Sequence, residues 1–244
     1  MEKRNIEVCY SPALFPAYQV SSEHIVVIVD ILRATTAITA AFDNGVKSII
    51  PVASPKQAEE YKKQGFLVAA ERDGIKLPFA DFGNSPFNFQ TEQVVGQTIA
   101  YSTTNGTQAI EMAKEAKKIA IAAFTNLSAM SGWIKKETGN VMILCAGWKN
   151  RFNLEDSVFA GALAEKLLEE NDLFSTDDDA TKASITLWKS AKNDLLQFAE
   201  TTSHRHRLKE YMLDDVLPFC FSIDTSSSVP IINNGRIIAH NTKI

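Results

Sequence analysis

Residues 25–38 read IVVIVDILRATTAI, and this stretch decides the fold. Its first part, Ile25–Val29, is an unbroken aliphatic run rich in β-branched residues, which is typical of a strand buried on both faces of a sheet. Thr35–Asp43 is then predicted to be a helix, because Asn44-Gly45 follows it in the positions of a C-cap. Asp30 and Arg33 lie between the two elements, so we expect two charged side chains at the carboxyl end of a buried strand.

The same alternation of strand and helix continues along the chain. Further strands are predicted at Ser48–Val52, Phe66–Ala70, Thr98–Ser102, Ile119–Ala123 and Asn140–Cys145. Further helices are predicted at Pro55–Lys63, Thr107–Lys117, Leu127–Lys136 and Leu154–Glu170. In the last part, we expect a surface turn at Asn171–Thr181, mostly helical structure at Lys182–Glu200 and Leu208–Leu213, and a closing hairpin at Val229–Ile238.

Repeated strand–helix units predict an α/β protein with three layers, α/β/α, around a mainly parallel or mixed sheet. One compact domain over residues 1–244 is the favoured interpretation, and a two-lobed version of it is the alternative. In such open sheets, ligands bind at the carboxyl ends of the strands. The functional residues are therefore expected in the turns that follow the strands.

The composition narrows the classes of function. The chain has 244 residues, of which 45% are hydrophobic, and a net charge of −4, which gives no reason to expect a nucleic-acid surface. No apolar run approaches the roughly 20 residues that span a bilayer, and the N-terminus lacks the apolar region of a signal peptide. The three cysteines are widely spaced without a CxxC pair, so we expect neither disulfides nor a zinc site, and a cytoplasmic location. A homodimer is the expected oligomeric state.

The turn STTNGT at Ser102–Thr107 has the composition of an anion cradle. Gly106 permits close backbone approach, the hydroxyl groups can donate, and the helix that follows presents free N–H groups. The alternative is an ordinary helix N-cap and turn, since the same residue types dominate those positions.

The turn DILRATT adds a carboxylate and a guanidinium. Arg33 can bind phosphate, carboxylate or sulfonate through two donors, and Asp30 is an oxygen ligand suited to Mg²⁺. The alternative is that Asp30 and Arg33 pair with each other. Glu71 also follows an apolar strand directly and opens the turn-rich segment Glu71–Phe89, so two carboxylates are expected to converge on one rim, unless this segment is only a surface loop.

The segment CAGWKNRFNLED at Cys145–Asp156 permits two kinds of chemistry. Cys145 and Arg151 fit the C-x5-R pattern of cysteine phosphatases, in which a thiolate attacks phosphate. Glu155 and Asp156 are either ordinary first-turn acids of a helix or metal ligands. By contrast, SHRHRLKE at Ser203–Glu210 offers no metal-ligand spacing and is interpreted as a solvated helix face.

Taken together, these segments resemble the 2-phosphosulfolactate phosphatase family, known from coenzyme M biosynthesis. The resemblance rests on VVIVDILRATTAI, NGVKSIIPV, AERDGIKLPFADFGNSP, YSTTNGTQAI, LCAGWKNRFNLEDSVFAGAL and VPIINNGRI. It implies an α/β fold and a Mg²⁺-dependent phosphatase that acts on phosphate esters of small 2-hydroxy acids, with 2-phosphosulfolactate as the expected substrate. The chain departs from the family pattern at Ala70 and Asp73, where glycines are expected, and at the bulky Trp148.

The resulting site hypothesis combines the residues of all these turns. Asp30, Arg33 and Glu155 are the expected catalytic residues, and Asp30, Glu71, Glu155 and Asp156 are the expected ligands of Mg²⁺. Arg33, Thr35, Thr36, Asn84, Ser85, Thr103, Thr104, Asn105, Gly106, Thr107, Gly147 and Arg151 are the expected substrate-binding residues. Four alternatives stay open: a phosphoenzyme on Asp30, a cysteine phosphatase that uses Cys145 and Arg151, a different phosphate-ester or sugar-phosphate enzyme, and a non-catalytic anion-binding protein.

Overall fold

The computed structural model describes residues 3–170 and 172–240, and the stretch that opened the sequence analysis forms its centre. Strand β2 (His24–Val29) lies between β7 (Lys118–Ala122) and β8 (Asn140–Cys145) and is parallel to both. Strand β1 (Arg4–Cys9) continues this half of the sheet on the far side of β8. Every residue of Ile25–Val29 is fully buried, as a central strand with helices on both sides requires.

A second parallel group forms the other half of the sheet. It contains β3 (Ser48–Pro51), β6 (Thr98–Ser102) and β4 (Leu67–Arg72). The terminal hairpin of β10 (Pro230–Asn233) and β11 (Arg236–Ala239) joins the two halves, because β11 pairs antiparallel with β3 and β10 pairs antiparallel with β7. The closing hairpin is therefore confirmed, and the full strand order is β5-β4-β6-β3-β11-β10-β7-β2-β8-β1-β9.

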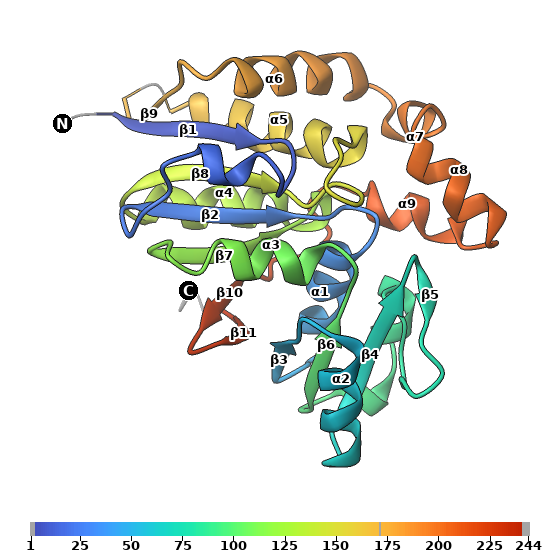
Figure 1. The fold of residues 1–244 in the computed structure, drawn as a ribbon. Helices are drawn as coiled ribbons and strands as arrows, with labels where there is room; N and C mark the ends of the chain where they lie inside the picture. Colours follow the sequence, from blue (N-terminus) through green and yellow to red (C-terminus); the bar gives the residue numbers. More distant parts are fainter. Residues whose placement is uncertain (1–2, 171, 241–244) are drawn as a thin grey trace.

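Helices cover both faces of this sheet (Figure 1). Helices α4 (Leu127–Lys136), α5 (Leu154–Leu168) and α6 (Asp179–Ala191) pack on one face. Helices α1 (Ala34–Asp43) and α3 (Gly106–Met112) pack on the other. Helix α2 (Pro55–Lys63) covers the strands of the smaller half, where Ala58 packs against Val68. The predicted α/β fold with a mainly parallel, mixed sheet is thus confirmed.

The smaller elements complete the chain. They are the strands β5 (Ile75–Lys76) and β9 (Phe174–Ser175), the helices α7 (Leu195–Ala199), α8 (Ser203–Glu210) and α9 (Leu217–Cys220), and the 3-10 turns η1 (Phe15–Ala17), η2 (Pro86–Phe89), η3 (Glu92–Val94), η4 (Phe124–Asn126) and η5 (Asp214–Val216). In the part of the chain that the structure describes, no helix has both the length and the apolar character needed to cross a bilayer.

Several predicted boundaries are wrong, each for a local reason. Strand β1 and strand β5 were not predicted, since the RNIEVC sequence of β1 mixes polar with apolar residues and β5 has only two residues. The mostly helical structure expected over Lys182–Glu200 is confirmed; it consists of two helices, because the Asp194 side chain accepts a hydrogen bond from the Gln197 N–H and caps the second one. Likewise, the surface turn expected at Asn171–Thr181 (Asn171 lies outside the described residues) contains β9 and the first turn of α6.

The closest packing in the helical layers predicts a sensitive position. Gly161 of α5 faces α6, and a Cβ at this position would overlap the carbonyl oxygen of Ser184. We expect Gly161→Ala to lower the free energy of unfolding by about 1–3 kcal/mol, because main-chain atoms cannot move aside cheaply. Urea denaturation measures this, and Gly132→Ala on α4 is the matched control, since nothing lies within 4 Å of a Cβ there. Equal stability of the two variants would show that α5 and α6 are less tightly packed.

Candidate active site

The predicted site residues gather where β2 and β8 end side by side. Val29 and Cys145 are register partners in the parallel pair, and the Ala146 N–H donates to the Val29 carbonyl at 2.7 Å. The turns that follow the two strands therefore leave the same rim of the sheet. The expected convergence of Asp30 with the Cys145–Asp156 segment is confirmed by this register.

Asp156 ties these two turns to the start of α5. Its Oδ1 accepts from the Ile31 N–H at 2.8 Å, and its Oδ2 accepts from the Gly147 N–H at 3.1 Å and from Asn153 Nδ2 at 3.0 Å. Burial, together with the charges of Asp30 and Glu155, raises the pKa of Asp156 well above its usual range, while the N–H donors act in the opposite direction. These donors bond to both oxygens, so Asp156 holds the turns after β2 and β8 in place, and its role as a Mg²⁺ ligand stays a prediction.

Glu71 joins two turns on the other half of the sheet. Its Oε1 accepts from the Thr104 N–H at 2.7 Å, and its Oε2 accepts from the Gly74 N–H at 2.6 Å. The turn between β4 and β5 has positive φ at Asp73 (54°) and Gly74 (86°), which an Asp-Gly pair tolerates well. Asp73 can therefore stand where the family pattern suggests glycine. Both oxygens of Glu71 therefore hold neighbouring turns in place, and its role as a Mg²⁺ ligand stays a prediction.

Arg33 and Asp30 do not pair with each other. Arg33 is 3% exposed and donates from Nη2 to the Gly74 carbonyl at 2.9 Å, and no ion pair joins it to Asp30 within the described part of the chain. Burial lowers the pKa of the guanidinium, while the nearby acidic groups, which include Glu71 and Asp30, oppose this shift. The structure thus contradicts the pairing alternative, and each of the two charges keeps the ability to bind something else.

The Asp30 carboxylate has little hydrogen bonding of its own. Oδ1 accepts only a long bond of 3.4 Å from the Ala34 N–H, and Oδ2 faces Gly106, at which a Cβ would lie 3.6 Å away. Burial raises the pKa of Asp30 to about 6, with His204 acting in the opposite direction and Glu71 and Glu155 adding to the rise. Gly106 thus lets the start of α3 come close to the Asp30 carboxylate, whose Oδ2 has no hydrogen-bond partner among the described residues.

Glu155 has a partner that the sequence analysis missed. His204 Nδ1 lies 2.8 Å from Glu155 Oε1, and the two side chains are almost fully buried. Trp148 packs against the His204 ring at 5.4 Å, and Arg207 lies over the Trp148 ring at 4.5 Å. The interpretation of SHRHRLKE as a solvated helix face is therefore wrong.

The contact between His204 and Glu155 joins residues 49 positions apart, so no local spacing could reveal it. The sequence carried only a weak sign that this helix has a buried face. His204 and Leu208 lie four residues apart, which places them on one face of a helix, and both are buried. An inward face was therefore present in the pattern.

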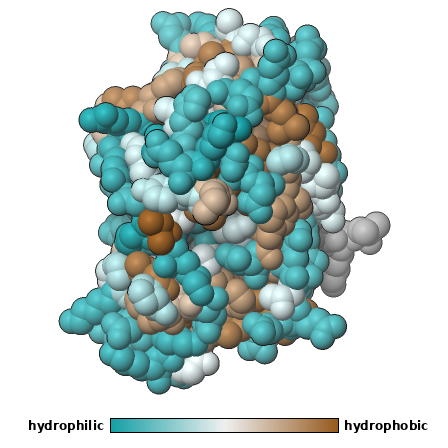
Figure 2. Space-filling view, turned by 90° about the vertical axis from the view of Figure 1, so that its right-hand side faces the viewer, coloured by the Kyte–Doolittle hydropathy of each residue, from teal (hydrophilic) through white to brown (hydrophobic). Residues whose placement is uncertain are grey.

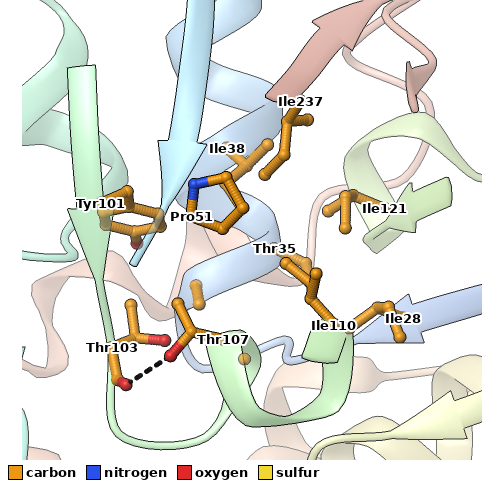
Figure 3. A pocket seen from close by; sticks show the side chains of 12 residues that line it. Ile28, Thr35, Ile38, Pro51, Tyr101, Thr103, Thr107, Ile110, Ile121 and Ile237 are labelled. Atoms are coloured by element: carbon orange, nitrogen blue, oxygen red, sulfur yellow. Dashed lines mark hydrogen bonds between the residues drawn. The ribbon is translucent and has the colours of Figure 1, made fainter. Parts of the chain in front are cut away.

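The STTNGT turn uses most of its polar groups internally. Thr107 Oγ1 donates to the Thr103 carbonyl at 3.0 Å (Figure 3), and Thr104 Oγ1 contacts Glu71. Asn105 forms no side-chain cap; its Oδ1 instead accepts from the Lys149 N–H at 3.2 Å. Thr103 Oγ1 is buried without a hydrogen-bond partner among the described residues. The turn is therefore neither a simple helix N-cap nor an open anion cradle. Most of its polar groups bond within the turn, and Asn105 bonds to the loop that carries Lys149.

A small cavity lies under this turn, between α1, α3 and β6 (Figure 3). Its volume is about 10 Å³, and isoleucine side chains, among them Ile28, Ile38 and Ile110, provide much of its wall. This space holds at most one water molecule and offers no charge to bind an anion. This cavity is therefore too small and too apolar to hold a phosphate ester.

The remaining predicted residues fall into three groups. The hydroxyls of Thr35 and Thr36 bond to the carbonyls of Asp30 and Ile31 and so stabilise the turn before α1. Asn84 is buried with an unpartnered Oδ1, whereas Ser85 is only half-buried. Gly147, at φ 60°, fits against the carbonyl of Arg151, and Arg151 is exposed at the end of the tight turn over Lys149-Asn150.

The cysteine alternative gains no support from these positions. Cys145 is fully buried, and burial together with the charge of Asp156 raises the pKa of its thiol well above the usual range. A neutral thiol is a poor nucleophile. Because Arg151 is also exposed, the C-x5-R pattern does not form a phosphate loop with a buried guanidinium.

Asp30 and Glu155 are the carboxylates of this rim that could hold a magnesium ion. No group of three or more His, Cys, Asp or Glu residues within residues 3–170 and 172–240 is arranged to hold a metal by itself. Mg²⁺ commonly takes only one or two carboxylates and completes its coordination with water and substrate phosphate. Asp30 Oδ2 and Glu155 Oε2 have no hydrogen-bond partner in the described residues, so this donor set meets that need.

Comparison with known proteins gives one consistent result. The family model described as 2-phosphosulpholactate phosphatase matches residues 9–235. A protein of Caldanaerobacter subterraneus subsp. tengcongensis named probable 2-phosphosulfolactate phosphatase is 37% identical over 216 residues, which cover 87% of this chain and 89% of the relative. A protein of Thermotoga maritima with the same name is 37% identical over 212 residues, which cover 87% of this chain and 90% of the relative.

The positioning role of Glu71 predicts a loss of stability on Glu71→Gln. Glutamine has one acceptor oxygen, so its amide group would face one of the two N–H donors, and we expect the free energy of unfolding to fall by about 1–3 kcal/mol. Urea denaturation measures this, with the exposed Glu169→Gln as the matched control. Unchanged stability together with a large loss of Mg²⁺ affinity would instead make Glu71 a metal ligand.

Proposed function

The chain belongs to the 2-phosphosulpholactate phosphatase family, and from this premise we propose that it hydrolyses 2-phosphosulfolactate to sulfolactate and inorganic phosphate. One structural observation carries the proposal most directly. Arg33 and Asp30 are buried three residues apart in one turn and bind neither each other nor another charged partner within the described residues. Burial of two charges without a charged partner costs desolvation free energy. A phosphate at Arg33 and a metal ion at Asp30 would offset this cost.

We propose that Asp30 and Glu155 hold Mg²⁺. Both offer carboxylate oxygens at the same rim, and the charge of Glu155 contributes to the raised pKa of Asp30. The ion, when bound, would neutralise charge on the phosphoryl oxygens. Asp156 and Glu71 would keep the surrounding turns in place, since their oxygens are already bonded to N–H groups.

The other steps of the reaction would depend on Arg33, Glu155 and His204. Arg33 would bind the phosphoryl oxygens through the donors that its bond to Gly74 leaves available, and so stabilise the charge of the transition state. The Glu155 carboxylate would orient the attacking water, and His204 would hold that carboxylate in one rotamer through Nδ1. A bond from the water oxygen to phosphorus forms, the bond from phosphorus to the ester oxygen breaks, and one proton of the water is transferred to that ester oxygen, which leaves as the hydroxyl of the 2-hydroxy acid.

Removal of the metal is the first test of this proposal. We expect treatment with EDTA to abolish phosphate release from 2-phosphosulfolactate and 2-phospholactate, and added Mg²⁺ to restore it. Asp30→Asn and Glu155→Gln should each reduce kcat/KM on the order of 100-fold or more, by analogy with the loss of one charge-stabilising group. The exposed Asp172→Asn is the matched control.

Cys145→Ser separates this mechanism from the cysteine route, since the serine variant should keep activity of the same order. Full activity in EDTA together with an inactive Cys145→Ser would overturn the metal mechanism. No hydrolysis over a panel of phosphate monoesters would favour a non-catalytic anion-binding protein.

The raised pKa of Asp30 predicts the acid side of the pH profile. Because its pKa is about 6 before metal binds, Asp30 gains a proton as the pH falls through that value and loses the charge that a metal needs. We expect kcat/KM at low Mg²⁺ to fall about tenfold per pH unit below this point. More Mg²⁺ should move the fall to lower pH, because metal and proton compete for the same oxygens. An acid limb that does not respond to Mg²⁺ would contradict the role given to Asp30.

A further inference from the structure

Trp148 lies in the turn after β8, and its ring contacts two side chains of α8. The His204 ring lies 5.4 Å from the Trp148 ring, and the Arg207 guanidinium lies over it at 4.5 Å. His204 and Arg207 are three residues apart in the helix, so both project from one face of it. His204 also contacts Glu155. The tryptophan therefore packs against the residue through which α8 reaches the candidate active site.

Helix α8 has little apolar surface that could hold it in place. Its sequence SHRHRLKE contains one aliphatic residue, Leu208, which is buried. The helix lies at the right of Figure 1, and Figure 2 looks onto that side of the molecule, where hydrophilic residues cover most of the surface. Hydrophobic burial is non-directional, so one buried leucine does not fix the rotation of a helix about its axis. Directional contacts have to supply that orientation.

The ion pairs of α8 connect it to its neighbours in the chain. Arg205 contacts Glu200 at 3.0 Å and Asp214 at 3.1 Å, and these two residues lie directly before and after the helix. These ion pairs therefore leave the position of α8 relative to the sheet undetermined. The contacts of His204 and Arg207 with the turn after β8 and with α5 are the ones that set it.

The indole ring suits this contact because a cation over an aromatic face is attracted by the ring, and tryptophan gives the strongest attraction of this kind. Arg207 Nε is buried without a hydrogen-bond partner among the described residues. The stack on Trp148, and not a hydrogen bond to Nε, therefore holds this guanidinium.

The backbone that carries Trp148 is itself fixed. Trp148 and Arg151 exchange two backbone hydrogen bonds of 3.0 Å, which close a tight turn over Lys149-Asn150. Both central residues have positive φ, 51° and 62°, as a type I′ turn requires. The Lys149 N–H also donates to Asn105 Oδ1 at 3.2 Å, which attaches this turn to the other half of the sheet. The ring is thus presented to α8 from a backbone that is held on two sides.

The contact that Trp148 covers is the hydrogen bond between His204 and Glu155. Because a carboxylate only accepts, His204 Nδ1 carries the proton and donates it to Glu155 Oε1 at 2.8 Å. A ring packed beside the imidazole limits its rotation and keeps water from this bond, and a hydrogen bond shielded from water is electrostatically stronger.

We propose that Trp148 is a positioning residue of the candidate active site. Together with Arg207 it fixes the orientation of α8, and through His204 it holds the Glu155 carboxylate in the orientation that catalysis needs. The inference rests on the phosphatase function proposed above, in which Glu155 orients the attacking water. Trp148 acts through His204 and makes no contact with the substrate in this role.

Steady-state kinetics on 2-phospholactate with saturating Mg²⁺ provides the first test. Trp148→Ala should lower kcat about 10- to 100-fold and change KM less than about threefold, because a displaced carboxylate affects the transition state more than substrate binding. Trp148→Phe keeps an aromatic face and should restore most of the rate. Phe152→Ala is the matched control, since it removes an exposed aromatic side chain of the same loop that packs on Tyr10, and it should leave kcat unchanged.

A double variant tests whether the effect passes through His204. In a His204→Ala background, Trp148→Ala should lower kcat no further, because changes to residues that act through one another are not additive. An additional loss of the same size in the double variant would overturn this route.

The last readout needs neither turnover nor metal. Proton–nitrogen correlation NMR detects the Nδ1–H of His204, which is assigned by its loss in His204→Ala, and measures its exchange with water. Trp148→Ala should accelerate this exchange about tenfold or more, whereas Trp148→Phe should not. Arg207→Met removes only the cation and should act in the same direction, which keeps the test valid if Trp148→Ala does not fold.

The two kinds of readout separate this inference from the proposed function. If the wild-type protein hydrolyses no ester but the exchange depends on Trp148, the proposed function fails and Trp148 still positions the pair of His204 and Glu155. If hydrolysis proceeds but neither kcat nor the exchange responds to Trp148→Ala and Arg207→Met, the positioning role is wrong and the proposed function stands. A fall in kcat with unchanged exchange would also overturn the positioning role.

Discussion

The site depends on one kind of interaction, a buried carboxylate that accepts N–H groups from two different turns. Asp156 binds the turn after β2 to the turn after β8, and Glu71 binds the turn after β4 to the turn after β6. Each carboxylate thus fixes a pair of loops at the carboxyl ends of parallel strands. Loops lack the regular backbone hydrogen bonds of a sheet. Charge-assisted hydrogen bonds to these carboxylates therefore set their position.

Placing several buried carboxylates at one edge of the sheet has an electrostatic cost. Asp156 comes close to Asp30 and Glu155, and the mutual repulsion contributes to the raised pKa values of Asp30 and Asp156. The protein offsets part of the cost with His204 beside Glu155 and with the N–H donors around Asp156. What remains is excess negative charge next to a buried guanidinium, and a divalent cation with a phosphate would balance both.

The sequence predicted the parts of this site that local pattern controls. A buried aliphatic run identified β2, and the polar turn after it located Asp30 and Arg33 at the rim. It could not separate Glu155 from Asp156, which are neighbours in the chain, because the helix sends one side chain towards His204 and the other towards the turns of β2 and β8. It could not find His204 either, since that contact depends on how α8 packs and not on any spacing.

The two halves of the sheet share the candidate site. Asp30, Glu155 and His204 belong to the half built on β2 and β8, whereas Gly74 and the STTNGT turn belong to the half built on β4 and β6. The terminal hairpin separates these halves within the sheet, so few strand bonds hold them in register: one residue pair joins β11 to β3, and one joins β10 to β7. The bond from Arg33 to Gly74 crosses the same divide at the rim. A phosphate ester bound by Arg33 would therefore contact a side chain that already joins both halves, and its binding energy would stabilise their relative position.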